Sequence, residues 1–231
     1  MQAILLNIRH GGGRRAQSIL EWLARRSPDV IALPEWRNNA PGAVLKAGLE
    51  SRGFQTATAT TNGDNGVLFA AKSPFASSCV TPLDARLGRP FSAREGRGGA
   101  LLIADFGDLR ILSAYFPGGK LKAAFFQICT AQVEASTVPF VLIGDINTGR
   151  SDVDVEGTGT PFDCVAEFEA LRLSIYGVRN TATRRRNGAG ARRQAPSDGA
   201  TAFGSTMLSR TRLFGRNFQT SDAFTIIRPA K

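Results

Sequence analysis

The sequence predicts an α/β fold, and three observations favour it. Short apolar runs of strand length alternate with segments of helical period over the first 173 residues of this 231-residue chain. Apolar residues make up 42% of the chain, which is enough for a domain with a substantial core. Several apolar runs end in a polar side chain, and α/β folds gather ligand sites at the ends of strands.

The first part of the chain shows two rounds of this alternation. The expected order is a strand at 3–6, a helix at 16–23, a strand at 30–33 that ends at Pro34, and a helix at 43–51. Three glycines at 11–13 separate the first strand from its helix, and Gly53 stops the second helix.

The middle of the chain adds apolar runs that read as further strands. We expect strands at 66–71 and 99–104, a hairpin turn at 107–108 into a strand at 109–115, a helix at 122–135, a strand at 139–144 and a short helix at 162–171. The run at 139–144 is continuously apolar, as in strands that are buried on both faces.

Composition changes after residue 173. Residues 174–231 hold eleven Lys and Arg against two Asp and Glu, whereas residues 1–173 hold eighteen against seventeen. The net charge of +10 therefore belongs mostly to the tail and is no evidence for a nucleic-acid surface on the folded body. Because the Arg-, Gly- and Ala-rich stretch at 184–193 has no apolar period, we expect a domain at 1–173 and a basic, disordered tail at 174–231.

The sequence also bears on compartment and assembly. No run reaches the roughly 18 apolar residues of a membrane span, and the N-terminal segment MQAILLNIRH has a polar break too early for a signal peptide. We therefore expect a cytoplasmic protein. No segment indicates self-association, so a monomer is expected.

The residues most indicative of chemistry are Asp145 and Asn147, in the sequence Gly-Asp-Ile-Asn after an apolar run. Side chains alternate along a strand, so these two point to the same side. Polar groups also end other strands, namely Asn7, Glu35 and Tyr115. Taken singly, each has a structural explanation, such as a turn cap, a solvated loop residue or a core boundary. Together they predict a site for a hard cation and a phosphate ester.

The order of these motifs resembles the endonuclease/exonuclease/phosphatase superfamily, whose members have the deoxyribonuclease-like fold. The matching pieces are Leu6-Asn7-Ile8, Leu33-Pro34-Glu35, Asn65-Gly66-Val67-Leu68, Tyr115-Phe116-Pro117 and Gly144-Asp145-Ile146-Asn147. The resemblance covers about residues 2–173. It implies a four-layer αββα sandwich, in which two mixed sheets pack face to face between outer helices.

The resemblance also implies roles for the matching residues. Asn7 and Glu35 would hold a divalent metal ion, Mg²⁺ or Mn²⁺, which suit oxygen ligands. Tyr115 would contact the scissile phosphate, Asp145 would position or deprotonate the attacking water, and Asn147 would stabilise a phosphate oxygen. The implied function is metal-dependent hydrolysis of a phosphoester, with DNA or RNA among the candidate substrates.

The chain departs from the family pattern near its end. The family has an Arg-Ile-Asp-His/Tyr-type strand and then a Ser-Asp-His whose histidine contacts the phosphate. Here the tail offers Ser221-Asp222-Ala223, and the single histidine, His10, belongs to the glycine-rich turn after the first strand. We therefore expect the last strands to be missing, and the missing Asp-His pair argues against activity in this chain.

Two alternatives to an active hydrolase stay open. One is an inactive relic that binds at most a metal ion or phosphate. The other is a nucleic-acid-binding protein that works through its Arg-rich tail, whose eleven basic residues would bind phosphates in a salt-sensitive way. The tail has few aromatic residues among its arginines, which disfavours the second alternative.

A one- or two-base frameshift near residue 173 would explain the departure. Read from the third base of each codon, residues 203–209 admit Arg-Ile-Asp-His-Ala-Phe, and residues 173–177 admit Val-Asp-Leu-Trp. Resequencing the gene across codons 165–231 is expected to reveal a shift that restores Arg-Ile-Asp-His and then Ser-Asp-His. An unchanged frame would make the tail a genuine property of the protein and refute the hypothesis.

Overall fold

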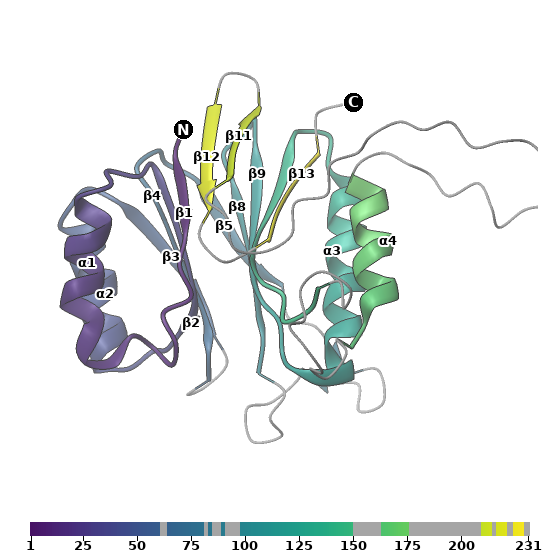
Figure 1. Cartoon of the computed structure of the whole chain (residues 1–231), viewed down its shortest axis with the longest axis horizontal. Coiled ribbons are helices and arrows are strands. Elements are labelled where there is room, and N and C mark those ends of the chain that lie inside the picture. The colour runs from purple at the N-terminus through teal and green to yellow at the C-terminus, as the bar shows by residue number, and fades with distance from the viewer. Residues whose placement is uncertain are drawn as a thin grey trace, which may run out of the picture.

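Two β-sheets lie face to face, and helices cover the outer face of each, in the computed structural model of the chain (Figure 1). The structure describes residues 1–60, 64–80, 83–84, 89–90, 98–149, 163–175, 209–213, 216–220 and 224–228. The predicted sandwich of two mixed sheets with outer helices is confirmed.

The first sheet comes from the N-terminal part of the chain. Its strands lie in the order β1 (Ala3–Leu5), β2 (Val30–Trp36), β4 (Gly66–Ala71) and β3 (Gln55–Ala59). β1 pairs with β2 in parallel, whereas β4 runs antiparallel to both β2 and β3. The C-terminal ends of β1 and β2 and the start of β4 therefore lie together at the same end of the sheet.

The second sheet has the same kind of arrangement. Its strands lie in the order β13 (Phe224–Arg228), β10 (Phe140–Asp145), β9 (Arg110–Tyr115), β8 (Ala100–Asp105) and β5 (Ala76–Val80). β9 and β10 are parallel, and the other neighbours pair antiparallel. Two short hairpins complete the described strands, β6 (Leu83–Asp84) with β7 (Arg89–Pro90) and β11 (Ser209–Leu213) with β12 (Arg216–Thr220).

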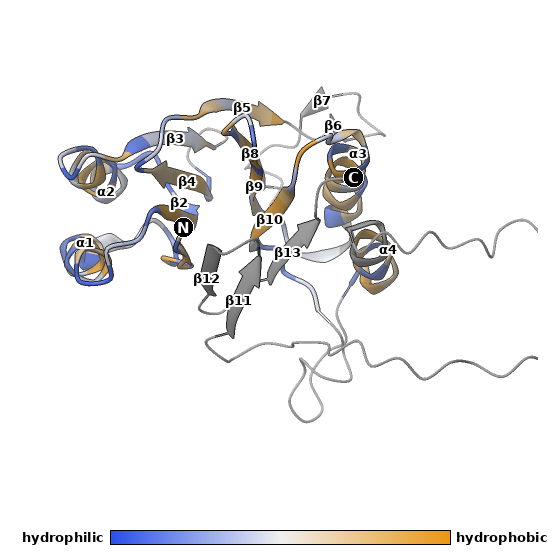
Figure 2. Ribbon diagram, turned by 90° about the horizontal axis from the view of Figure 1, so that it is seen from above, coloured by the Kyte–Doolittle hydropathy of each residue, from blue (hydrophilic) through white to orange (hydrophobic). Residues whose placement is uncertain are grey.

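The helices form the outer layers. α1 (Ala16–Ala24) and α2 (Ala40–Glu50) lie on one side of the strands, and α3 (Ala123–Ala135) and α4 (Val165–Ile175) lie on the other (Figure 2). Short 3₁₀ turns at Gly13–Arg15 and Gly119–Lys122 lead into α1 and α3. Within the described part of the chain, no helix combines the length and the apolarity that crossing a bilayer demands.

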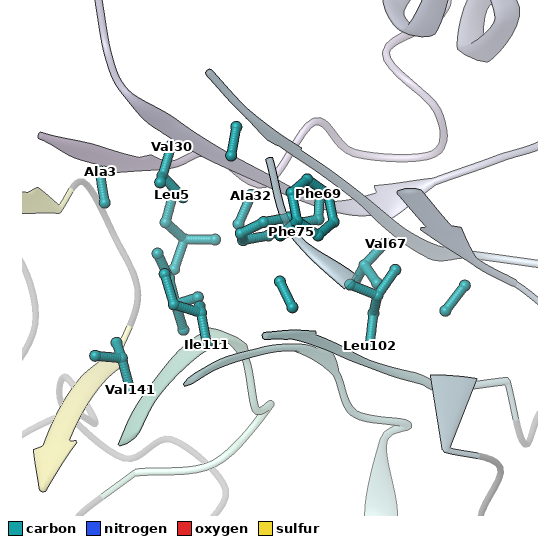
Figure 3. Packing of buried hydrophobic residues seen from close by; sticks show 14 of the residues in the cluster. Ala3, Leu5, Val30, Ala32, Val67, Phe69, Phe75, Leu102, Ile111 and Val141 are labelled. Atoms are coloured by element: carbon teal, nitrogen blue, oxygen red, sulfur yellow. The ribbon is translucent and has the colours of Figure 1, made fainter. Parts of the chain in front are cut away.

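Three clusters of apolar side chains lie between the two sheets and between each sheet and its helices. Ala3 and Leu5 of β1 face the second sheet, whereas Ile4 between them packs with the residues of α1 and α2. The same alternation runs through the central strands of both sheets, as expected for strands buried on both faces. Between the sheets, Phe69 meets Phe75 edge to face with ring centroids 5.2 Å apart (Figure 3).

Some elements differ from the prediction in extent. β2 does not end at Pro34 but continues to Trp36, because a bulge between these residues accommodates the proline. α2 begins at Ala40, before the expected residue 43, since the Asn39 side chain accepts a hydrogen bond from the Gly42 N–H and caps the helix.

The strands β3 and β5, like the two-residue strands β6 and β7, were not predicted. The sequences of β3 and β5, Gln-Thr-Ala-Thr-Ala and Ala-Ser-Ser-Cys-Val, carry no apolar run. Both lie at the edge of a sheet, where one side of the strand has no neighbour and exposed side chains are tolerated. Pairing with an apolar neighbour, rather than local pattern, therefore determines these strands.

The tail contains strands where disorder and missing strands were expected. β13 pairs with β10 over Phe224–Arg228, and β11 and β12 form a hairpin. Pairing with β13 satisfies the backbone groups along one side of β10, which would otherwise be an open edge. The arginine-rich stretch at 184–193 and Ser221-Asp222-Ala223 lie outside the described residues, so the domain boundary at 173 stays a prediction.

Gly144 is expected to be sensitive to substitution, because β10 and β9 approach closely there. A Cβ atom at Gly144 would lie 2.2 Å from the carbonyl oxygen of Ala114, which belongs to the paired backbone. Gly144→Ala should lower the free energy of unfolding by about 1–3 kcal/mol, measured by urea denaturation. Gly118→Ala is the control, since no atom lies within 4 Å of a Cβ there. Equal losses in the two variants would contradict this prediction.

Candidate active site

Polar side chains from both sheets converge at one end of the sandwich, where β1, β2, β9 and β10 end and β4 begins. Asn7 follows β1, Glu35 belongs to β2, Asn65 directly precedes β4, and Tyr115 and Asp145 are the last residues of β9 and β10. These side chains form one hydrogen-bonded network. The shared direction of the parallel pairs, β1 with β2 and β9 with β10, explains why their ends meet.

The amide group of Asn7 links carboxylates from the two sheets. Its Nδ2 donates to Oε1 of Glu35 at 2.9 Å and to Oδ2 of Asp145 at 2.7 Å. Its Oδ1 accepts from the backbone N–H of Arg9 at 2.9 Å. The amide nitrogen of Asn7 therefore faces the carboxylates, while its oxygen faces the turn after β1.

Glu35 owes its position to a bulge in β2. The pairing with β4 shifts register between Pro34 and Trp36, and Glu35 has a φ of +59°, an uncommon conformation for glutamate. The turn after β1 holds it there. The backbone N–H of His10 donates to Oε2 of Glu35 at 2.9 Å, and the N–H of Gly11 donates to its carbonyl oxygen at 2.7 Å.

Asn65 is a site residue that the sequence analysis quoted in a motif but did not select. Its Nδ2 donates to Oε2 of Glu35 and to Oη of Tyr115, both at 3.2 Å. Its Oδ1 accepts from Nε of Arg37 at 2.6 Å. Its place just before the predicted strand at 66–71 was the available signal, but only the antiparallel direction of β4 puts it at this end of the sandwich.

Asn147 lies beside the other predicted residues but bonds differently. Its Nδ2 donates to the carbonyl oxygen of Phe116 at 2.6 Å, and its backbone N–H donates to Oδ1 of Asp145 at 3.1 Å. It has a φ of +49° and an exposed side chain. The structure thus joins Asn7, Glu35, Tyr115 and Asp145 through side chains, and connects Asn147 to Asp145 through its main chain.

His10 and Arg37 border the site. Nη2 of Arg37 lies 2.9 Å from Nδ1 of His10, and that nitrogen lies 3.6 Å from Oε2 of Glu35. The backbone of His10 has a φ of +54°, so the residue serves the glycine-rich turn as expected. Its imidazole is 72% exposed and lies at the site as well.

Burial shapes the acidity of Asp145. It raises the pKa of this carboxyl group above its ordinary value, and the nearby charge of Glu35 acts in the same direction. Hydrogen bonds from the backbone of Asn147 and from Asn7, together with the charge of Lys122, oppose the rise in pKa. The site therefore holds negative charge where water is partly excluded, which favours a cation.

The pKa of the Tyr115 phenol is also raised, first of all by burial. The hydrogen bond from Asn65 lowers it, the charges of Glu35 and Asp145 raise it, and that of Arg37 lowers it. The phenol is therefore protonated near neutral pH and can donate a hydrogen bond.

The donor set suits a hard divalent cation. Carboxylate oxygens come from Glu35 and Asp145, Asn7 would add an amide oxygen once its amide group turned over, and no described residue brings a thiolate into this network. Among the described residues, no three His, Cys, Asp or Glu side chains form a metal-binding group. Mg²⁺ commonly binds one or two carboxylates and completes its shell with water and substrate phosphate, so the residues present fit Mg²⁺ better than Zn²⁺.

Comparison with known proteins is consistent with this architecture. The model of the Endonuclease/Exonuclease/phosphatase family matches residues 4–213. The match covers most of the chain and includes the residues of the network described above. No curated protein matches the chain significantly.

The chain is similar to solved structures at low sequence identity. An endonuclease/exonuclease/phosphatase from Beutenbergia cavernae is 19% identical with a TM-score of 0.50, over 74% of this chain and 53% of that one. Humanized TDP2 from D. rerio is 18% identical with a TM-score of 0.49, over 64% and 63%. An AP endonuclease from Archaeoglobus fulgidus is 19% identical with a TM-score of 0.45, over 68% and 60%. The chain matches less than two thirds of each of these structures.

Removing the Asn65 side chain should raise the pKa of Tyr115 further. Asn65 donates to the phenolic oxygen and so favours its ionised form. Ultraviolet titration of tyrosinate can measure the shift because the chain has two tyrosines, and Tyr176→Phe removes the second signal. In that background Asn65→Ala is expected to titrate at higher pH than the parent. The exposed neighbour Asn38 provides the control Asn38→Ala, and identical curves for the two variants would contradict the prediction.

Proposed function

The chain belongs to the Endonuclease/Exonuclease/phosphatase family, and on that premise we propose that it hydrolyses phosphoester bonds at the Asn7–Glu35–Asp145 cluster. The enzymes for which the family is named all cleave such bonds. One observation carries the proposal: a single amide joins two carboxylates from different sheets, where their strands end. Such a cluster can hold a cation, a phosphate and a water within one small volume.

Asp145 is proposed as the base. The pKa of Asp145 is raised in the direction of neutral pH, and a base with a higher pKa accepts a proton from water more readily. The bond from Asn7 fixes the direction of one carboxylate oxygen and the Asn147 N–H that of the other. The carboxylate is therefore oriented before substrate arrives.

Tyr115 and Asn147 are proposed to contact the phosphate. Tyr115 stays protonated near neutral pH because burial raises its pKa, so its O–H can donate to a phosphate oxygen. Asn147 uses one amide N–H for the carbonyl of Phe116, and the other N–H is the one we assign to the phosphate. Arg37 at the border would attract the anionic substrate.

We propose Mg²⁺, or Mn²⁺ in its place, as the cofactor. Glu35 would hold it through its carboxylate, and Asn7 through its amide oxygen after the amide group turns over, because Nδ2 faces the carboxylates without the ion. When bound, the ion would stabilise the negative charge that develops on the phosphate. Nucleic acids and smaller phosphoesters are both candidate substrates, and the nearly balanced charge of residues 1–173 favours neither. We also propose that the protein is a monomer located in the cytoplasm.

The alternative is an inactive relative that binds phosphate or nucleic acid. The family resemblance implies a histidine held by an aspartate, and the single histidine of this chain is His10. Its Nδ1 faces Arg37 and Glu35 instead. The alternative therefore predicts ligand binding without turnover.

Hydrolysis of bis(p-nitrophenyl) phosphate with and without Mg²⁺ separates these possibilities. Glu35→Gln and Asp145→Asn are each expected to lower kcat by about 100-fold or more, since they remove the metal ligand and the base. Glu50→Gln is the control, because Glu50 is an exposed residue of α2 paired with Lys46 at 2.6 Å.

Thermal unfolding measures binding of Mg²⁺ independently of turnover. Mg²⁺ should raise the thermal unfolding midpoint of the parent protein, since it binds only the folded state, and should raise that of Glu35→Gln less. Mg²⁺-induced stabilisation without turnover would support the inactive relative. No Mg²⁺ effect on either quantity would refute the proposed cofactor.

A further inference from the structure

Lys122 is a buried cation at the back of the site. It ends the 3₁₀ turn before α3, and only 2% of its surface is exposed. Fully buried lysines are rare, because removing an ammonium group from water is costly unless a partner compensates. Among the residues whose side chains are described, no carboxylate lies within ion-pair distance of this ammonium group. Within the described residues, an ion pair therefore does not account for its burial.

The ammonium group instead donates to the carbonyl oxygen of Asn147. Asn147 is thereby held at three points, since its N–H donates to Asp145 and its side chain donates to Phe116. These bonds stabilise a left-handed backbone conformation that asparagine tolerates but does not favour. The carbonyl would be free to turn away if Lys122 were absent.

We infer that Lys122 is a positioning residue, whose ammonium group clamps the Asn147 backbone and thereby orients the Asp145 carboxylate. The inference deepens the proposed function, on which its catalytic consequence rests. It assigns Lys122 no contact with substrate. The clamp acts through two successive hydrogen bonds, from Lys122 to the Asn147 carbonyl and from the Asn147 N–H to Oδ1 of Asp145.

The charges around Lys122 support this role. Burial lowers its pKa, while the charges of Asp163 and Asp145 favour the ammonium form. Its positive charge in turn favours the ionised form of Asp145. A neutral side chain of similar length would fill the space but would provide neither the donor nor the charge.

Steady-state kinetics tests the consequence for catalysis. Lys122→Met is expected to lower kcat by about 10- to 100-fold, as small misplacements of catalytic groups do, and to leave KM within about threefold. Lys46→Met is the matched control, because Lys46 is a lysine of α2 whose side chain is 41% exposed, and it should change neither. A rise in KM with kcat unchanged, or no change in either, would overturn the inference.

Amide hydrogen exchange tests the clamp without requiring activity. The Asn147 N–H should exchange at least about tenfold faster in Lys122→Met, because its hydrogen bond to Asp145 loosens, while amides of Val141 and Leu142 in β10 keep their protection. Unchanged exchange at Asn147, or faster exchange throughout β10, would contradict the clamp. If the parent protein shows no turnover, the proposed function fails and this measurement still decides the role of Lys122. Lys122→Leu, which likewise has no donor and no charge, is the second variant if the methionine variant does not fold, with the same pattern expected.

Discussion

The hydrogen bonds donated by one asparagine amide, that of Asn7, organise the site. An amide nitrogen can donate two hydrogen bonds, and this one donates to Glu35 of the first sheet and to Asp145 of the second. Without it, two partly buried carboxylates would face each other with mutual repulsion. Asn65 and the turn after β1 donate hydrogen bonds to the other carboxylate oxygen of Glu35. On the Asp145 side, Lys122 donates to the backbone of Asn147.

Residues with a strained backbone lie next to the Asn7 amide and its two carboxylate partners. Glu35 and Asn147 both adopt positive φ, a kind of conformation that costs of order 1–3 kcal/mol per residue and persists where surrounding contacts enforce it. Hydrogen bonds from His10, Gly11 and Lys122 supply those contacts. The apolar layers between and outside the sheets hold the strands themselves in regular geometry, so the irregular conformations lie at the strand ends, beside the carboxylates.

The sequence predicted the central strands well because both of their faces are buried, which makes each a continuous apolar run. It did not predict β3 and β5, which lie at sheet edges and carry polar residues. Asn65 and Lys122 were not selected for a related reason. An asparagine before a glycine indicates a turn, and a lysine at the start of a helix indicates a solvated residue. The packing of neighbouring segments partly buries the asparagine and fully buries the lysine.

The sequence by itself therefore determined which segments become central strands and which polar residues follow them, since alternation and turn chemistry are local properties. Only the tertiary structure decided which of those residues bond to one another. Asn7 is separated from Glu35 by 28 positions and from Asp145 by 138. Their contact depends on two sheets packing face to face with their strand ends aligned, and no local pattern records that alignment.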